Sequence, residues 1–221
     1  METVGKRAGA VRLFAAAALL VLLFSVNCFA GGIGARNCVK KAKKAVILVG
    51  DSRVMHMALS ASSASRKNFY FVYANGKGIL DLANNVGGFR TNLTKAMKKY
   101  PNATVVFMLG VNYNYEATEN KRLNVYDSFI KSKTWKKHRF VVSTVGKTVG
   151  CRGSYSNSRV KSFNRKIASR YAGRKDVRIY DLYAFLDGKV LSKKDTRNGD
   201  GLHYKKDMYT KILKDLRKFT G

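Results

Sequence analysis

Acidic residues, prolines, cysteines and histidines are all scarce in this 221-residue chain. A single proline among 19 glycines, with no repeated period, excludes collagen-like, proline-rich and repeat architectures. Three scattered histidines and three cysteines give no spacing of zinc ligands, so we expect neither a metal nor a cofactor. Only 13 Asp and Glu accompany 43 Lys and Arg, which leaves a formal net charge of +30.

The rest of the composition is that of a folded domain. Hydrophobic residues make up 46% of the chain and aromatic residues 11%, which is enough for a sizeable core and excludes a disordered basic tail. We expect one globular domain with no internal boundary.

The basic residues are spread from Lys40 to Lys218 and form no single block. This dispersion favours a general attraction to polyanions or anionic surfaces over sequence-specific recognition. A surface that only confers solubility is the alternative. We expect no specific nucleic acid partner, because the strands lack an aromatic RNA-binding signature.

Residues 1–30 have the pattern of a secretory signal peptide. Three basic residues precede an apolar run from Leu13 to Val26, and Ala30 lies where a signal peptidase would cleave. A retained membrane anchor is one alternative, although the run is shorter than the roughly 20 residues of a transmembrane helix. Lipid modification of Cys28 is a second, weaker alternative. Cleavage near Ala30 would leave a secreted or envelope-associated protein of charge +28. Residues 31–44 are then a basic lead-in to a domain at 45–221.

Two cysteines, Cys38 and Cys151, would remain after cleavage. In an oxidising compartment, a disulfide that closes a loop of about 100 residues stabilises by up to ~4.7 kcal/mol in the chain-entropy model. However, Cys38 precedes the first expected strand and Cys151 follows a later one, so a parallel sheet would start them at opposite edges. The sequence leaves this disulfide open.

Short apolar runs alternate with segments of helical spacing. The runs that indicate strands are 45–49, 69–73, 103–109, 139–145 and 177–182. The segments that indicate helices are 54–62, 80–100 with a break at Gly87-Gly88, 117–131, 156–171 and 204–219. This alternation predicts a three-layer α/β/α sandwich around a parallel sheet of about five strands. Ligands of such sheets bind beyond the carboxyl ends of the strands, so a site is expected in the loops that follow them.

The first of these loops is Gly50-Asp51-Ser52-Arg53. A hydroxyl at the start of the following helix would be presented at the sheet edge, where free N–H groups of the first turn stabilise an oxyanion. A role as an ordinary helix N-cap is the alternative for Ser52. The next two loops, Asn75–Gly78 and Gly110–Asn114, hold glycines and asparagines that supply oxyanion donors, although the same residues also form plain turns.

Asp200 and His203 precede the last expected helix. A carboxylate three residues before an imidazole can fix its tautomer and favour the protonated ring, as the base that activates a serine requires. An exposed histidine with Asp200 as a helix cap is the alternative. Of the other histidines, His56 lies one helical turn after Ser52 and at most lines the site, and His138 falls in a basic run.

Four motifs, taken in order, resemble the signature blocks of the SGNH (GDSL) hydrolase superfamily: Gly50-Asp51-Ser52, a glycine after the second strand, Gly110-Val111-Asn112 and Asp200-Gly201-Leu202-His203. The resemblance covers most of residues 45–221 and implies a flavodoxin-like sheet. It also implies Ser52 as the nucleophile, His203 as general base and then acid, and Asp200 as the residue that orients His203. The implied oxyanion donors are the N–H of Ser52, an N–H at Gly76 or Gly78, and the side chain of Asn112.

Two positions next to these motifs are candidate substrate contacts. Tyr113 follows Asn112 where the superfamily usually has aspartate, which alters the wall of the site more than its chemistry. Arg53 follows Ser52 and is a candidate contact for an anionic group of the substrate, with an ordinary surface arginine as the alternative.

The resemblance implies a serine ester hydrolase that acts through an acyl-enzyme. We expect it to remove acetyl or other small acyl groups from a carbohydrate or cell-wall polymer, and the ester substrate to be carried on an anionic polymer. The alternatives are a lipolytic esterase or lysophospholipase with the same residues, and a non-catalytic polyanion-binding module on the same fold.

Overall fold

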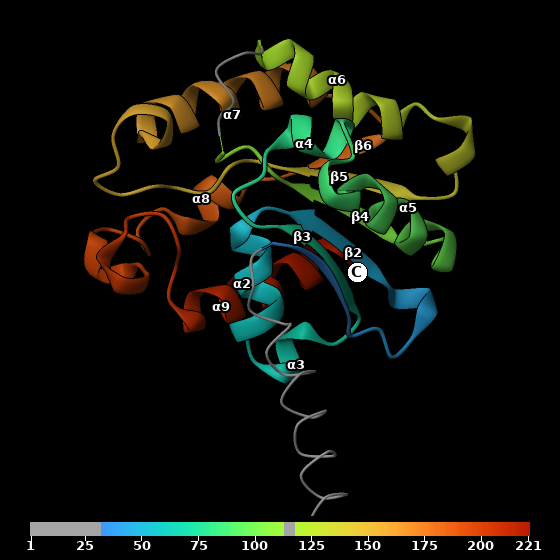
Figure 1. Ribbon diagram of the computed structural model, residues 1–221, viewed down its shortest axis with the longest axis horizontal. Coiled ribbons are helices and arrows are strands. Elements are labelled where there is room, and N and C mark those ends of the chain that lie inside the picture. The colour runs from blue at the N-terminus through green and yellow to red at the C-terminus, as the bar shows by residue number, and fades with distance from the viewer. Residues whose placement is uncertain (1–31, 113–117) are drawn as a thin grey trace, which may run out of the picture. The chain divides into compact units, whose positions relative to one another are not determined.

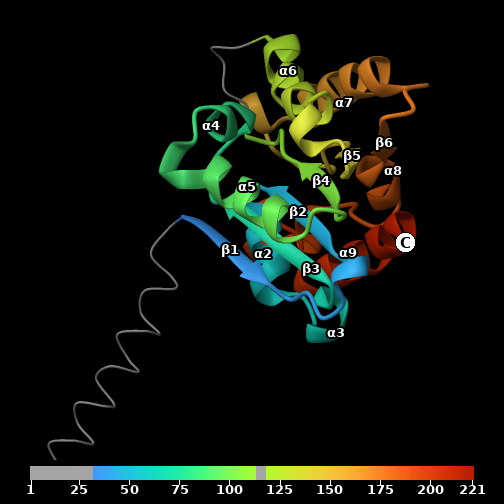
Figure 2. The ribbon, with the colours of Figure 1, turned by 90° about the vertical axis from the view of Figure 1, so that its right-hand side faces the viewer.

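The computed structural model describes residues 32–112 and 118–221. Within the compact unit Ile33–Gly221, a six-stranded sheet has the order β1-β3-β2-β4-β5-β6 (Figures 1 and 2). The strands are β1 Ile33–Asn37, β2 Val46–Gly50, β3 Phe69–Ala74, β4 Thr104–Met108, β5 Arg139–Ser143 and β6 Val177–Tyr180. Strands β2 to β6 run parallel, and their order is that of a flavodoxin-like sheet. The predicted fold class is confirmed.

Helices cover both faces of the sheet, as Figure 1 shows. One face carries α4 Ile79–Ala83, α5 Phe89–Lys99, α6 Glu119–Ile130 and α7 Asn157–Tyr171. The opposite face carries α2 Ser52–Ser60, α8 Leu182–Leu186 and α9 Lys206–Thr220, with the short α3 Ser63–Arg66 in contact with α9. These are the three layers that the alternating sequence predicts.

One hydrophobic core lies on each side of the sheet. In β2, Ile47 and Val49 join the core under α4 to α7, whereas Val46 and Leu48 join the core under α2, α8 and α9. Because successive side chains of a strand point to opposite faces, a strand buried on both faces reads as a continuous apolar run. Helix α9 buries Tyr209 and three aliphatic residues at helical spacing, and each aliphatic side chain is worth about 1.5–3 kcal/mol on burial: Ile212, Leu213 and Leu216.

The structure departs from the expected elements at both ends of the sheet's strand order. Part of the predicted basic lead-in, Ile33–Asn37, forms β1, which pairs antiparallel with β3 at the sheet edge. The last strand ends at Tyr180 because the Asp181 carboxylate accepts the N–H of Ala184 and caps α8, which was not predicted. The break expected at Gly87-Gly88 is confirmed: the segment at 80–100 is divided into α4 and α5, and Gly87 and Gly88 adopt positive φ angles of 55° and 80°.

Cys38 and Cys151 are both free thiols. The N–H of Cys38 donates to the carbonyl of Phe69, at the start of β3, whereas Cys151 contacts the carbonyl of Asp200 beyond the other end of the sheet. They lie at opposite edges, so the structure does not form this disulfide. The predicted signal peptide, with Ala30 and Cys28, lies outside the described residues. In the ranges that are described, no helix has the length and apolar character to cross a membrane.

Candidate active site

The site lies at the carboxyl edge of the sheet, where β2, β3 and β4 end side by side. Gly50 is paired with Tyr73 of β3 and with Met108 of β4, so the loops that follow these strands begin at the same level. A Cβ on Gly50 would collide with the side chain of Val54 and the carbonyl oxygen of Met108. Only glycine therefore allows the chain to turn from β2 directly into α2.

Asp51 is the N-cap of α2. Its Oδ1 accepts the N–H of Arg53 at 2.9 Å, and the residue is only 1% exposed. Burial raises the pKa of Asp51, an effect that the nearby Arg53 opposes. The N-cap role considered for Ser52 is therefore wrong, because Ser52 is the first residue of the helix and its hydroxyl has another partner.

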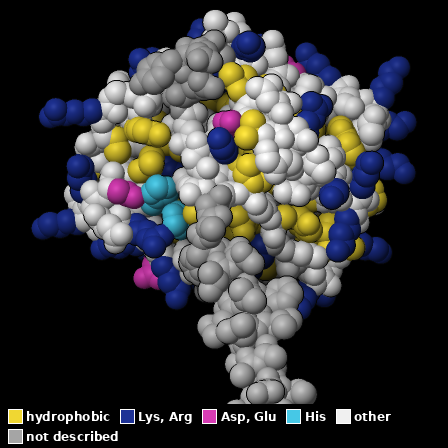
Figure 3. Space-filling model, in the orientation of Figure 1, with side chains coloured by type: hydrophobic (Ala, Val, Ile, Leu, Met, Phe, Trp, Pro, Cys, Tyr) yellow, Lys and Arg dark blue, Asp and Glu magenta, His cyan; other side chains and the backbone are white. Residues whose placement is uncertain are grey.

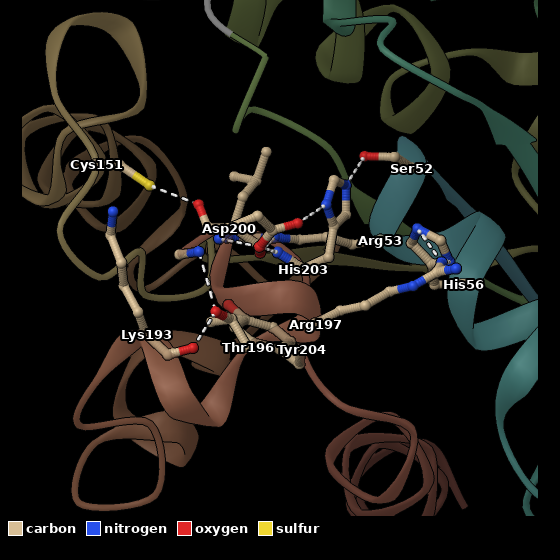
Figure 4. A network of polar contacts seen from close by, with 12 residues as sticks. Ser52, Arg53, His56, Cys151, Lys193, Thr196, Arg197, Asp200, His203 and Tyr204 are labelled. Atoms are coloured by element: carbon tan, nitrogen blue, oxygen red, sulfur yellow. Dashed lines mark hydrogen bonds and ion pairs between the residues drawn. The ribbon is translucent and has the colours of Figure 1, made fainter.

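Ser52, His203 and Asp200 form a continuous chain of hydrogen bonds (Figure 4). The distance from Ser52 Oγ to His203 Nε2 is 2.8 Å, and that from His203 Nδ1 to Asp200 Oδ2 is 2.7 Å. Since an ionised carboxylate only accepts, Nδ1 carries the proton, and the lone pair of Nε2 accepts from the serine hydroxyl. This is the arrangement in which an imidazole can remove the serine proton.

The loop that carries Asp200 holds its carboxylate in place. Asp200 Oδ1 accepts the backbone N–H groups of Leu202 at 2.7 Å and His203 at 2.8 Å. Burial favours the neutral acid, but these two donors and the His203 ring outweigh it and lower the pKa of Asp200. At neutral pH the residue is an anion. Gly201 has a φ of 73°, and a Cβ there would collide with the carbonyl oxygen of Val149, so the loop requires glycine.

The two candidate oxyanion loops contact each other. Asn112 Nδ2 donates to the carbonyl of Lys77 at 3.0 Å, and a Cβ on Gly78 would lie 2.8 Å from the carbonyl oxygen of Asn112. The N–H of Gly78 donates to the Asp81 carboxylate at 2.7 Å, so of the two glycines Gly76 is left as the candidate donor. Tyr113, the predicted wall of the site, lies outside the described residues.

Arg53 has a role that the sequence did not indicate. The residue is 3% exposed, and its guanidinium donates to the carbonyls of Leu202 at 3.0 Å, Gly146 at 2.8 Å and Lys147 at 3.3 Å. Its Cζ also lies 4.8 Å from the centre of the Tyr204 ring. This corrects both roles considered for Arg53, the substrate contact and the surface arginine: the side chain is buried and joins α2 to the loops at 146–147 and 202.

His56 is closer to the site than its position in the sequence indicated. Its ring centre lies 4.9 Å from that of His203 in an edge-to-face contact, and 6.0 Å from that of Tyr209. Arg197 Nη1 donates to His56 Nδ1 at 3.1 Å. Burial lowers the pKa of His56 to about 4, helped by the neighbouring His203 and Arg197. The spacing of four residues from Ser52 on one helix was the only sequence signal, and nothing indicated Arg197.

His138, the third histidine, does not belong to the site. His138 is buried away from the site, with Nδ1 3.1 Å from the carbonyl of Ala103. Over residues 32–112 and 118–221, no group of three or more His, Cys, Asp and Glu side chains is placed to hold a metal ion.

Solved structures of similar fold include a GDSL-like lipase from Bacteroides thetaiotaomicron, with a TM-score of 0.61 and 14% identity over 83% of this chain and 92% of that one. The chain has the fold of the SGNH (GDSL) hydrolase superfamily. The acetyl xylan esterase AlAXEase has a TM-score of 0.58 and 15% identity over 80% of this chain and 99% of its own. An acetyl-xylooligosaccharide esterase from Geobacillus, solved as a mutant, has a TM-score of 0.55 and 13% identity over 80% and 93%.

Comparison at the level of sequence gives nothing further, since no family model and no curated protein matches the chain. At identities of 13–15%, the likeness to these SGNH-fold structures is one of fold.

Proposed function

We propose that this chain is a serine ester hydrolase that acts through a covalent acyl-enzyme. The observation that carries the proposal is the chain of two hydrogen bonds from Ser52 through His203 to Asp200, at 2.8 and 2.7 Å. These residues come from opposite ends of the domain and meet at the edge where ligands of parallel sheets bind. Their geometry matches the requirement for a nucleophile within reach of its base, with the base oriented by a third group.

In the first half-reaction, Ser52 Oγ attacks the ester carbonyl carbon while His203 Nε2 takes the hydroxyl proton. The ring then holds protons on both nitrogens, and the Asp200 carboxylate stabilises the resulting cation. The bond between the carbonyl carbon and the alcohol oxygen of the ester then breaks. His203 passes the Nε2 proton to that oxygen, and the alcohol leaves. The acyl group remains on Ser52.

In the second half-reaction, His203 removes a proton from water as the water oxygen attacks the acyl carbon. His203 then returns that proton to Ser52 Oγ as the bond between Oγ and the acyl carbon breaks, and the carboxylic acid leaves. Both steps build negative charge on the carbonyl oxygen. We assign the donors to this charge as the N–H groups of Ser52 and Gly76 and the amide of Asn112. The N–H of Ser52 belongs to the first turn of α2, where the helix dipole also favours an anion.

We further propose acetyl or other small acyl groups on a carbohydrate or cell-wall polymer as the substrate. The acetyl xylan and acetyl-xylooligosaccharide esterases among the structures of similar fold support this choice. Lys and Arg side chains project around the face that carries the histidines (Figure 3). A net charge of +30, or +28 after cleavage near Ala30, would concentrate the protein on an anionic polymer, with an effect that weakens as salt screens it.

Export is part of the proposal, because the pattern of residues 1–30 is that of a signal peptide. Expression in a host with a general secretory pathway, followed by mass measurement of the released protein, tests it. We expect the mass of a chain that begins near Gly31. A full-length protein retained in the membrane fraction would contradict export.

The deciding experiment is labelling with a fluorophosphonate, which reacts with activated serines. We expect the unaltered protein to be labelled, Ser52→Ala to be unlabelled, and Ser128→Ala, which changes a serine on the distant helix α6, to be labelled normally. Equal labelling of Ser52→Ala would refute Ser52 as the nucleophile. If the unaltered protein is not labelled either, the non-catalytic polyanion-binding module becomes the favoured function.

A panel of p-nitrophenyl esters, run beside acetylated polysaccharide, separates the two classes of esterase. A preference for the two-carbon chain supports deacetylation. A preference for long chains would instead point to lipolytic activity, the alternative that the GDSL-like lipase of similar fold favours.

A further inference from the structure

The catalytic loop is joined to helix α2 by a second arginine, Arg197, which the reaction above does not use. Its backbone N–H donates to the carbonyl of His203 at 2.6 Å, and its side chain donates to His56 of α2 at 3.1 Å. Figure 4 shows the side chain extending from the catalytic loop to α2 beside His203. One residue therefore contacts both the loop of the candidate base and the helix of the candidate nucleophile.

His56 has contacts that fix its ring on three sides. Tyr209 of α9 stacks on it at 6.0 Å with an interplanar angle of 20°, and His203 meets it edge to face at 4.9 Å. Arg197 supplies the third contact. Its Nη1 lies 3.1 Å from His56 Nδ1 and 3.4 Å from Nε2, and because a guanidinium only donates, one of these nitrogens must present a lone pair, so the imidazole is neutral. The lowered pKa of His56, about 4, keeps it in that form at neutral pH.

This arrangement limits the movement of the His203 ring. Asp200 and Ser52 hold its two nitrogens, and the His56 ring occupies the space beside it. Ordering the long, exposed Arg197 side chain costs conformational entropy, which a hydrogen bond to a half-buried acceptor offsets. A small displacement of a catalytic base is enough to slow the reaction strongly, so the contact bears directly on turnover.

We propose that Arg197 and His56 act as one positioning unit, in which Arg197 holds the His56 ring against His203 and so keeps His203 Nε2 in line with Ser52 Oγ. The inference rests on the proposed function. It treats both residues as positioning residues that do not touch the reacting atoms.

A double-mutant cycle tests the unit. His56→Phe keeps a ring beside His203 but removes the acceptor, and Arg197→Met removes the donors. We expect each variant to lower kcat about tenfold with KM within a factor of two, and the double variant to be no slower than the single ones. Arg165→Met, an exposed arginine of α7, is the matched control and should retain full activity.

Two kinetic results would overturn the proposal. A double variant about 100-fold slower than the unaltered protein would mean that the two residues act independently. A rise in KM at constant kcat would mean that Arg197 binds the substrate.

Hydrogen exchange of the 196–206 segment supplies a readout that needs no turnover. We expect faster exchange in His56→Phe and in Arg197→Met, and unchanged exchange in Arg165→Met. Unchanged exchange in all three refutes the positioning unit, whatever the kinetics. If the unaltered protein hydrolyses no ester and takes no fluorophosphonate while exchange responds as expected, the proposed function fails and the contact between loop and helix stands.

Discussion

Replacement of Arg53 by methionine should destabilise the whole domain, although the residue lies beside the candidate nucleophile. Methionine fills a similar volume but leaves the carbonyls of Leu202 and Gly146 without their guanidinium donors, whereas the carbonyl of Lys147 keeps the Tyr204 hydroxyl as a donor. A hydrogen bond to a charged group contributes about 1.5–3 kcal/mol. Part of that gain is offset, since methionine avoids the cost of burying a guanidinium. We therefore expect a net loss of about 3 kcal/mol in the free energy of unfolding.

Urea and thermal unfolding measure this loss. For a domain of this size, about 3 kcal/mol corresponds to a fall in Tm of about 6–12 °C. Arg53→Lys should be intermediate, because one ammonium cannot reproduce the fork of a guanidinium. Arg165→Met, the exposed control, should change stability by less than about 0.5 kcal/mol. If Arg53→Met stays within about 1 kcal/mol of the unaltered protein, the three hydrogen bonds contribute no net stability and the reasoning is wrong.

Four further outcomes are expected. Asp200→Asn should lower kcat by about 10⁴ in an ester assay with little change in Tm, because an amide does not hold the required tautomer of His203; a loss below tenfold would contradict its orienting role. Asn112→Ala should lower kcat by about 10²–10³, and an unchanged kcat would remove it from the oxyanion site. Gly201→Ala should reduce both activity and Tm, because the added Cβ collides with the Val149 carbonyl; normal values for both would refute that clash. Finally, His56 becomes protonated below pH 6.5 in the unfolded state but only near pH 4 in the folded state, where its pKa is about 4. The free energy of unfolding should therefore fall as the pH is lowered from 6.5 to 4, by at most about 3 kcal/mol. Urea unfolding of His56→Phe should lack this part of the fall, and identical pH dependence in both proteins would contradict it.

The parts of the fold that follow from local pattern could be predicted. Apolar runs such as 45–49 indicate buried parallel strands, and the rule that ligands bind beyond their carboxyl ends selects the loop at Ser52. The pairing of Asp200 with His203 could also be predicted, because a histidine that acts as a base for serine needs a carboxylate to orient it.

The remaining features depend on contacts between distant segments. β1 follows a glycine-rich stretch within a basic lead-in, and it becomes a strand only because the edge of β3 is available to pair with it. Arg53 reads as a surface residue because arginine is almost never buried unless its donors are satisfied, and the carbonyls that satisfy them lie more than 90 residues away. The acceptor that Arg197 finds in His56 is 141 residues distant.

The separation of Ser52 and His203 by 151 positions has a consequence for the order in which the molecule matures. A ribosome has to complete β2 through β6 before it makes the imidazole, and α9, whose Tyr209 hydroxyl accepts the N–H of Tyr204, is synthesised after it. A partly made chain therefore has a serine with no base beside it. Reactivity toward esters would arise only once α9 has docked, so a growing chain that still lacks α9 would not hydrolyse esters.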